Sequence, residues 1–213
     1  MPRALALIAL TVCSSDLASA GSKAAELPYA KQIRAAATAY RTWGRVDEHP
    51  NVAPTDCAAP LPIDGTPAHV RRSDAEDAPH GKKLYYLWAS DRAAYLNLGK
   101  RDAAIPNGFA IVKESFAAKQ LAKRPPAAKP GASFGAPDPI SWLEHDGKLL
   151  GTGDRKDLFV MTKVGDGAGT DDGWVYGTVA PDGTITSAGT VERCMSCHDD
   201  ATTHERLFGL KSR

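Results

Sequence analysis

The sequence lacks an excess of charge of either sign, because its formal net charge is only +1. A surface that binds nucleic acid or an anionic membrane needs clustered positive charge, so we expect neither partner. The apolar run at residues 4–12 is too short to cross a bilayer, which takes roughly 20 residues in a helix. The sequence also lacks internal repeats and signs of a second domain, and 213 residues suffice for one domain with a substantial core.

The N-terminus has the features of an export signal. Arg3 precedes the apolar run at residues 4–12, and the Ala-Ser-Ala at residues 18–20 is a small-residue cleavage pattern. We therefore predict a signal peptide at residues 1–20, one mature domain at residues 21–213, and a periplasmic or secreted location.

Cysteine is scarce, with four in the chain, yet two of them belong to a specific motif. Residues 194–198 read Cys-Met-Ser-Cys-His, and Cys-x-x-Cys-His is typical of covalent c-type haem attachment. The thiols of Cys194 and Cys197 would add across the two vinyl groups of the porphyrin, a distance that one helical turn spans. His198 then falls beneath the ring, where one imidazole nitrogen takes an axial position on the iron. We expect its other ring nitrogen to donate to a backbone carbonyl or a carboxylate.

Two other uses of this motif compete with haem. A zinc site could combine Cys194, Cys197 and His198 with His204, but structural zinc sites usually bring two separated ligand pairs. A thioredoxin-like redox pair would lie near a βαβ pattern, which the sequence does not show. In bacteria, covalent haem attachment occurs outside the cytoplasmic membrane, so the export signal agrees with the haem interpretation.

The other two cysteines have weaker meaning. Cys13 lies in the predicted signal peptide; it would suit a lipid anchor, but Val12 is a poor residue before a lipidated cysteine. Cys57 is either a small buried hydrophobe, which we favour, or a free thiol.

The pattern along the mature chain predicts an α+β fold. An N-terminal helix would pack on an antiparallel β-sheet that cups a c-type haem, with the haem-attachment helix near the C-terminus. Asp91 is suited to cap a short helix that ends near Leu98. The predicted elements are a helix at residues 24–43, strands at 84–88, 109–116, 158–164 and 174–180, a tight turn at 181–184 with a short return strand, and loops or linkers at 50–79, 117–139 and 165–173.

Several further side chains could serve the iron or simply support the fold. Met161 is the methionine that could reach a sixth coordination position, but its neighbours Phe159 and Val160 favour core packing. Trp174 and Tyr176 share a strand face and either line a pocket or pack in the core. We interpret the remaining polar candidates as solvent-exposed: His49, His69, His80, Asp199 and Asp200. Leu207 and Phe208 would form an apolar anchor near the C-terminus.

The sequence resembles the cytochrome P-460 family, which includes the cytochromes c′-beta. Two parts of the resemblance are specific, namely the haem motif at residues 194–198 and the Val-Lys-Glu at residues 112–114. Supporting similarities cover most of the mature chain: residues 40–43, Asp91 with Tyr95, 108–114, 159–163, 173–177, and Leu207 with Phe208.

By this resemblance, Lys113 takes the position of a lysine that is joined covalently to the porphyrin edge in hydroxylamine-oxidising members. Side chains alternate along a strand, so Lys113 would share a face with Phe109 and Ile111, and Glu114 the opposite face with residues 110 and 112. A buried charge needs a partner, and a haem link or a haem propionate would supply one for Lys113. The alternative is that the strand ends at Lys113 and both charges reach water.

Two function classes follow from the resemblance. The first is an oxidoreductase that oxidises hydroxylamine or a similar small nitrogen species at an iron with an open distal site. The second is a non-enzymatic haem protein that binds nitric oxide or transfers electrons. The partners that we consider are a small ligand or substrate, namely hydroxylamine or nitric oxide, a redox partner protein, and a second copy of the chain in a homodimer. Fold resemblance alone does not establish the chemistry.

Overall fold

A computed structural model describes residues 27–46, 50–53, 83–98, 105–126, 141–145, 147–199 and 206–207. The predicted signal peptide, Cys57 and almost all of the loop at residues 50–79 lie outside these ranges. The same is true of His49, His69, His80, Asp200, His204 and Phe208.

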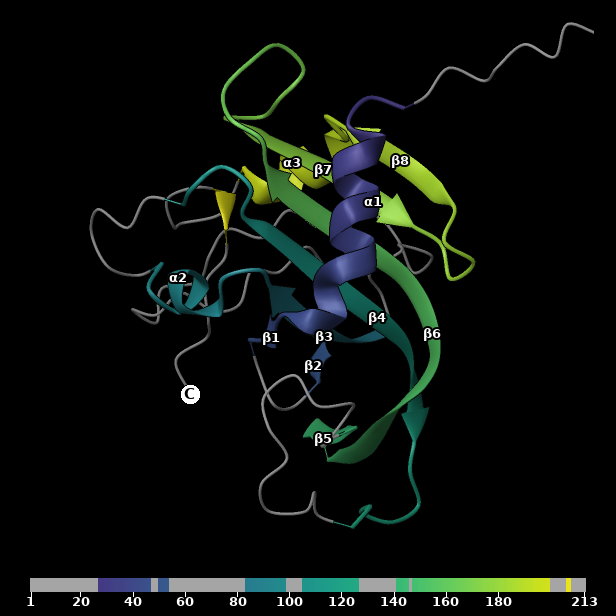
Figure 1. Ribbon diagram of the computed structural model, residues 1–213. Coiled ribbons are helices and arrows are strands. Elements are labelled where there is room, and N and C mark those ends of the chain that lie inside the picture. Colours follow the sequence, from purple (N-terminus) through teal and green to yellow (C-terminus); the bar gives the residue numbers. More distant parts are fainter. Residues whose placement is uncertain are drawn as a thin grey trace, which may run out of the picture.

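The described residues form one antiparallel sheet with a few helices, which confirms an α+β arrangement (Figure 1). The strand order is β1-β3-β4-β6-β7-β8, while β2 pairs with β3 and β5 pairs with β6. The strands are β1 (Gly44–Arg45), β2 (Asn51–Val52), β3 (Lys83–Ala89), β4 (Ala110–Gln120), β5 (Trp142–His145), β6 (Lys148–Lys163), β7 (Trp174–Val179) and β8 (Ile185–Gly189). The helices are α1 (Ala30–Ala39), a 3-10 turn (Tyr40–Thr42), α2 (Arg92–Leu96) and α3 (Glu192–His198).

Helix α1 covers one face of the sheet, which we call the helix face (Figure 1). Ile33 and Ala36 of α1, followed by Tyr40 of the 3-10 turn, recur at helical spacing and are all buried. A Cβ atom at Gly177 would lie 2.6 Å from Cγ2 of Ile33, so the glycine lets the helix approach strand β7 closely. The sheet residues beneath α1 are Tyr86, Trp88, Ala110, Val112, Phe116, Leu158, Val160, Val175 and Val179.

The opposite face of the sheet carries helix α3, and we call it the motif face. Its buried cluster includes Ile111, Met161, Trp174, Tyr176 and Leu207. Cys194 and Met195 of α3 pack against this cluster, as do Ala94 of α2 and Leu87 of β3. The haem motif therefore lies on the sheet face that α1 leaves uncovered.

Most predicted elements are present, with shifted ends. The N-terminal helix begins at Ala30 rather than at residue 24, because Tyr29 has a left-handed backbone (φ 60°) that no helix continues through. Asp91 caps α2 as predicted, since its Oδ1 accepts from the Ala94 amide at 2.9 Å. The tight turn at residues 181–184 and the return strand β8 are also confirmed.

Two loop assignments were wrong. Residues 51–52, in the loop predicted at 50–79, form strand β2, which pairs with β3. Residues 117–120 belong to strand β4, not to a linker, and the third predicted strand is the end of the much longer β6. The two extensions pair with each other as far as Gln120 and Leu150, and β5 adds a further strand beside them.

No described helix is long and apolar enough to cross a membrane.

Candidate functional site

Helix α3 positions the two motif cysteines. The amides of Cys194 and Met195 both donate to the Val191 carbonyl, at 2.8 and 3.0 Å, and begin the helix. Cys194 and Cys197 then lie about one turn apart, and both are half-buried. One turn of α3 therefore brings both thiols to the same side of this short helix, as the spacing of the motif predicts.

His198 ends the helix with a defined ring orientation. Its Nδ1 lies 2.7 Å from the backbone carbonyl oxygen of Arg206. Because a carbonyl only accepts, this contact places the hydrogen on Nδ1 and the lone pair that could bind a metal on Nε2. The structure thus has the hydrogen bond to a backbone carbonyl that the sequence predicts for an axial ligand.

The electrostatic surroundings of His198 favour a neutral imidazole. Burial lowers the pKa of His198, the hydrogen bond with Arg206 opposes this, and the charge of Lys113 lowers the pKa again. A neutral ring is the form that binds iron. Lys113 lies on the same face of the sheet as the motif, because it alternates along β4 with Ile111 of the motif-face cluster.

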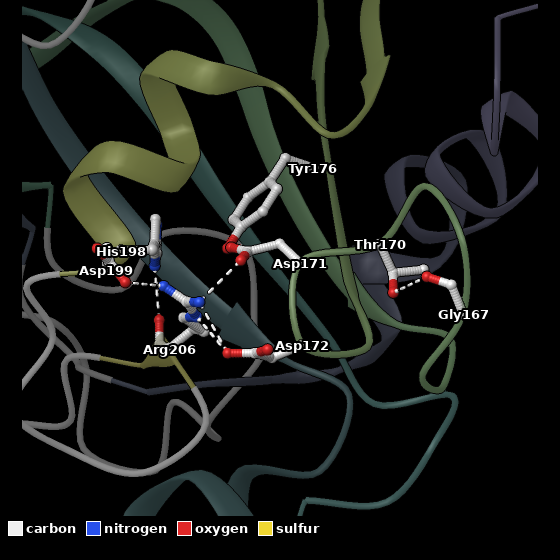
Figure 2. A network of polar contacts seen from close by, with 8 residues as sticks. All are labelled: Gly167, Thr170, Asp171, Asp172, Tyr176, His198, Asp199 and Arg206. Carbon is white, nitrogen blue, oxygen red and sulfur yellow. Dashed lines mark hydrogen bonds and ion pairs between the residues drawn. The ribbon is translucent and has the colours of Figure 1, made fainter.

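Arg206, whose carbonyl accepts the hydrogen bond from His198, also carries a guanidinium that lies in a network of charged groups (Figure 2). The Arg206 guanidinium contacts Asp171 at 2.9 Å, Asp172 at 2.7 Å, and also Asp199. Asp171 is buried, whereas the Asp199 and Asp172 carboxylates are exposed. Asp199 is solvent-exposed as predicted, but its ion pair with Arg206 is a contact that the sequence did not indicate.

Tyr176 joins this network to the imidazole. Its hydroxyl donates to Oδ2 of Asp171 at 2.6 Å, and its ring lies 5.4 Å from the His198 ring at an angle of 48° (Figure 2). Burial and the neighbouring Asp171 carboxylate raise the pKa of Tyr176, so the hydroxyl stays protonated and donates. The aromatic residue that the sequence assigned to a pocket wall or the core therefore contacts the motif histidine directly.

Lys113 lies on the motif face, as the strand alternation predicts. Its ammonium is 4.5 Å from the ring centroid of Tyr85 and 5.6 Å from that of Phe159. The ammonium of Lys83 lies over the same Phe159 ring, at 5.8 Å. Tyr85, Leu87 and Phe159 are only half-buried. This part of the sheet thus combines aromatic and aliphatic surface with two positive charges.

Glu114 faces the other way, into the helix face, where its side chain is 1 % exposed. Its carboxylate accepts from the Tyr40 hydroxyl at 2.7 Å and from Trp88 Nε1 at 3.2 Å, and it forms an ion pair with Arg41. The alternative in which the strand ends at Lys113 and both charges reach water is therefore wrong. Strand β4 continues to Gln120, and each charge has a different environment.

Met161 and Trp174 are buried in the cluster of the motif face, so the core interpretation of Met161 is confirmed. Leu207 is buried there too, as an apolar anchor should be. Within the described ranges, no three His, Cys, Asp or Glu side chains form a set that could hold a metal ion. The fourth ligand of the zinc alternative, His204, lies outside those ranges.

The donor set fits a c-type haem. Two thiols one turn apart precede an imidazole whose hydrogen bond directs its lone pair to Nε2. Tyr85, Leu87 and Phe159 leave half-buried apolar surface on the same face of the sheet, and Lys113 could pair with a propionate.

No protein-family model matches the sequence, and no curated protein matches it.

Proposed function

We propose that the chain is an exported cytochrome with a single c-type haem, bound through Cys194 and Cys197 on the motif face and ligated by His198. The observation that carries the proposal is the hydrogen bond between His198 Nδ1 and the Arg206 carbonyl. This hydrogen bond selects the tautomer of His198 whose lone pair is on Nε2. His198 directly follows the second of two thiols with haem-attachment spacing. A histidine that served only the fold would not need this combination.

The chemistry proposed for this site is oxidation of hydroxylamine or a similar small nitrogen species. The haem iron would supply an open coordination position and the redox chemistry, with electrons leaving to a redox partner protein. The chain's own part is to hold the imidazole, to keep the motif face apolar, and to direct the ammonium of Lys113 toward that face. Met161 is packed in the core, which supports an iron with no methionine ligand.

The second candidate is a non-enzymatic haem protein that binds nitric oxide or transfers electrons. One observation favours it: the Lys113 ammonium lies over the rings of Tyr85 and Phe159. Such contacts stabilise a cation without any covalent link to a porphyrin. A lysine already stabilised in this way need not be a cross-linking residue.

An optical spectrum of the reduced protein, together with a denaturing gel stained for haem, tests the proposal. The full-length chain is expressed in bacteria that mature c-type cytochromes, beside a Cys194→Ala, Cys197→Ala double variant. We expect one covalent haem per wild-type chain and none in the variant. A red-shifted, broadened Soret band indicates the enzyme, and an ordinary c-type spectrum indicates the second candidate. Haem that acidic organic solvent extracts from the wild type would overturn both.

A further inference from the structure

The ring of His198 is held at two places by one group of residues. At its edge, Nδ1 meets the carbonyl of Arg206 at 2.7 Å; beside its face lies the ring of Tyr176. Both contacts lead to the same buried carboxylate, because the Arg206 guanidinium and the Tyr176 hydroxyl each bind Asp171, at 2.9 and 2.6 Å. His198 is therefore linked to Asp171 by two routes, one through Arg206 and one through Tyr176 (Figure 2).

The backbone of Arg206 needs this support. Its φ of 59° lies in the left-handed region, which a residue with a side chain adopts only when its surroundings enforce it. Asp172, which accepts from both Nε and Nη2 of Arg206, is left-handed too, with a φ of 48°. The two left-handed positions thus meet in one ion pair, in which both Arg206 nitrogens reach the same Oδ2 of Asp172. The conformation that this pair holds is the one that aims the Arg206 carbonyl at His198.

The charges of the network are unequal. One guanidinium lies among three carboxylates, those of Asp171, Asp172 and Asp199. Asp171 is buried, so water screens its charge less than it screens the charges of the other two. A surplus of negative charge close to an iron ligand favours the oxidised, more positive state of the iron.

We propose that Arg206 is a positioning residue for the axial histidine: with Asp171 and Tyr176 it fixes the orientation and tautomer of the His198 ring. The surplus negative charge of the carboxylates in this network lowers the reduction potential of the iron. The inference rests on the proposed function, because it takes His198 as the ligand. It goes further in assigning a role to side chains outside the haem motif. Removal of Arg206 should leave thioether attachment intact, since that depends on the two cysteines.

The test compares haem-loaded wild type with Arg206→Ala, Arg206→Lys and Asp171→Asn. Arg124→Ala is the matched control, because Arg124 forms an exposed ion pair with Glu144 away from the motif. Three measurements are made: covalent haem per chain, the electron paramagnetic resonance spectrum of the ferric form, and the reduction potential. We expect full haem content in every variant. Arg206→Ala should broaden the ferric signal through a less uniform ring orientation, and Arg206→Lys should restore part of its sharpness. Asp171→Asn should raise the potential.

The outcomes separate the two levels of inference. A wild-type protein without covalent haem would refute the proposed function, whatever the variants do. Normal haem content with a ferric spectrum and potential unchanged in Arg206→Ala would refute the positioning role alone. If Arg206→Ala does not fold, Asp172→Asn decides, because this carboxylate is 77 % exposed and its loss leaves no buried charge. An unchanged ferric signal in Asp172→Asn would then overturn the inference.

Discussion

The hydroxyl of Tyr40, at the end of the N-terminal helical segment, donates to the buried carboxylate of Glu114 on the central strand β4 at 2.7 Å. Trp88 and Arg41 contact the same carboxylate, so strand β3 and the 3-10 turn converge on it as well. A buried carboxylate is tolerated when its oxygens are paired, and here three donors supply that pairing. This group fastens α1 to the sheet and leaves the opposite face to the motif.

We expect Tyr40→Phe to destabilise the fold by about 1–3 kcal/mol, because it removes one donor from a buried charged acceptor. The hydroxyl also accepts from Nε of Arg41 at 2.9 Å, so a second hydrogen bond is lost. Chemical denaturation monitored by circular dichroism measures the change. Tyr29→Phe is the matched control, since its hydroxyl makes an exposed contact of 3.3 Å and should matter by less than about 0.5 kcal/mol. Equal losses in both variants would contradict the pairing argument.

Tyr95 gives a prediction for alkaline pH. Burial raises the pKa of Tyr95 above its ordinary value of 10.0. The folded state therefore keeps its proton where the unfolded state has lost it, so the stability from Tyr95 is constant below pH 10.0 and declines above it. The stability difference between wild type and Tyr95→Phe should stay constant up to about pH 9 and shift in favour of the variant at higher pH. Denaturation curves at several pH values check this. A difference that does not change across that range would show that Tyr95 titrates alike in both states.

The parts of the fold that the sequence predicts well are those with a local signal. Strand β3 alternates buried and half-buried residues, and Asp91 caps α2 through a contact three residues away. The first half of β6 has no such signal, because it contains Gly151, Gly153 and several charges. It is a strand because the end of β4 pairs with it, and strand propensity yields to that kind of tertiary pairing.

The candidate site divides in the same way. The motif and the faces of Lys113 and Glu114 follow from spacing and from the alternation of a strand. The network around Arg206 does not, because its ion pair with Asp172 joins residues 34 positions apart and no periodic pattern marks either one. Tyr176 had a weak signal as an aromatic strand residue, but only the position of α3 shows that it meets His198.

Met161 tests the coordination that we propose for the haem iron. It is 5 % exposed and pairs across the sheet with Ile111 on one side and Tyr176 on the other. Met161→Leu nearly conserves volume, so it should cost less than about 1.5 kcal/mol and leave the optical spectrum unchanged. The ferric wild type should be high-spin and bind nitric oxide without displacing a side chain. A low-spin wild type whose methionine–iron charge-transfer band disappears in Met161→Leu would make electron transfer the leading function.

Lys113 and Lys83 form a matched pair for the question of enzyme activity. Both ammonium groups lie over the ring of Phe159, at 5.6 and 5.8 Å, but only Lys113 occupies the Val-Lys-Glu position. Burial lowers the pKa of Lys83, and the nearby charge of Asp157 opposes that effect. Lys83 lies on the motif face because it shares a face of β3 with Tyr85. If the proposed oxidation depends on Lys113, Lys113→Leu should abolish it and remove any red shift of the Soret band. Lys83→Leu should keep the band position and most of the rate.

The measurement is hydroxylamine oxidation with an artificial electron acceptor, together with spectra of both variants. Each variant removes one charge near the Phe159 ring, so a loss of rate that came only from a weaker positive field would appear in both. A loss confined to Lys113→Leu therefore identifies a role for that particular side chain. If Lys113→Leu binds nitric oxide as the wild type does and has an unchanged spectrum, the Lys113 ammonium only packs against Tyr85 and Phe159, and the chain is the non-enzymatic haem protein.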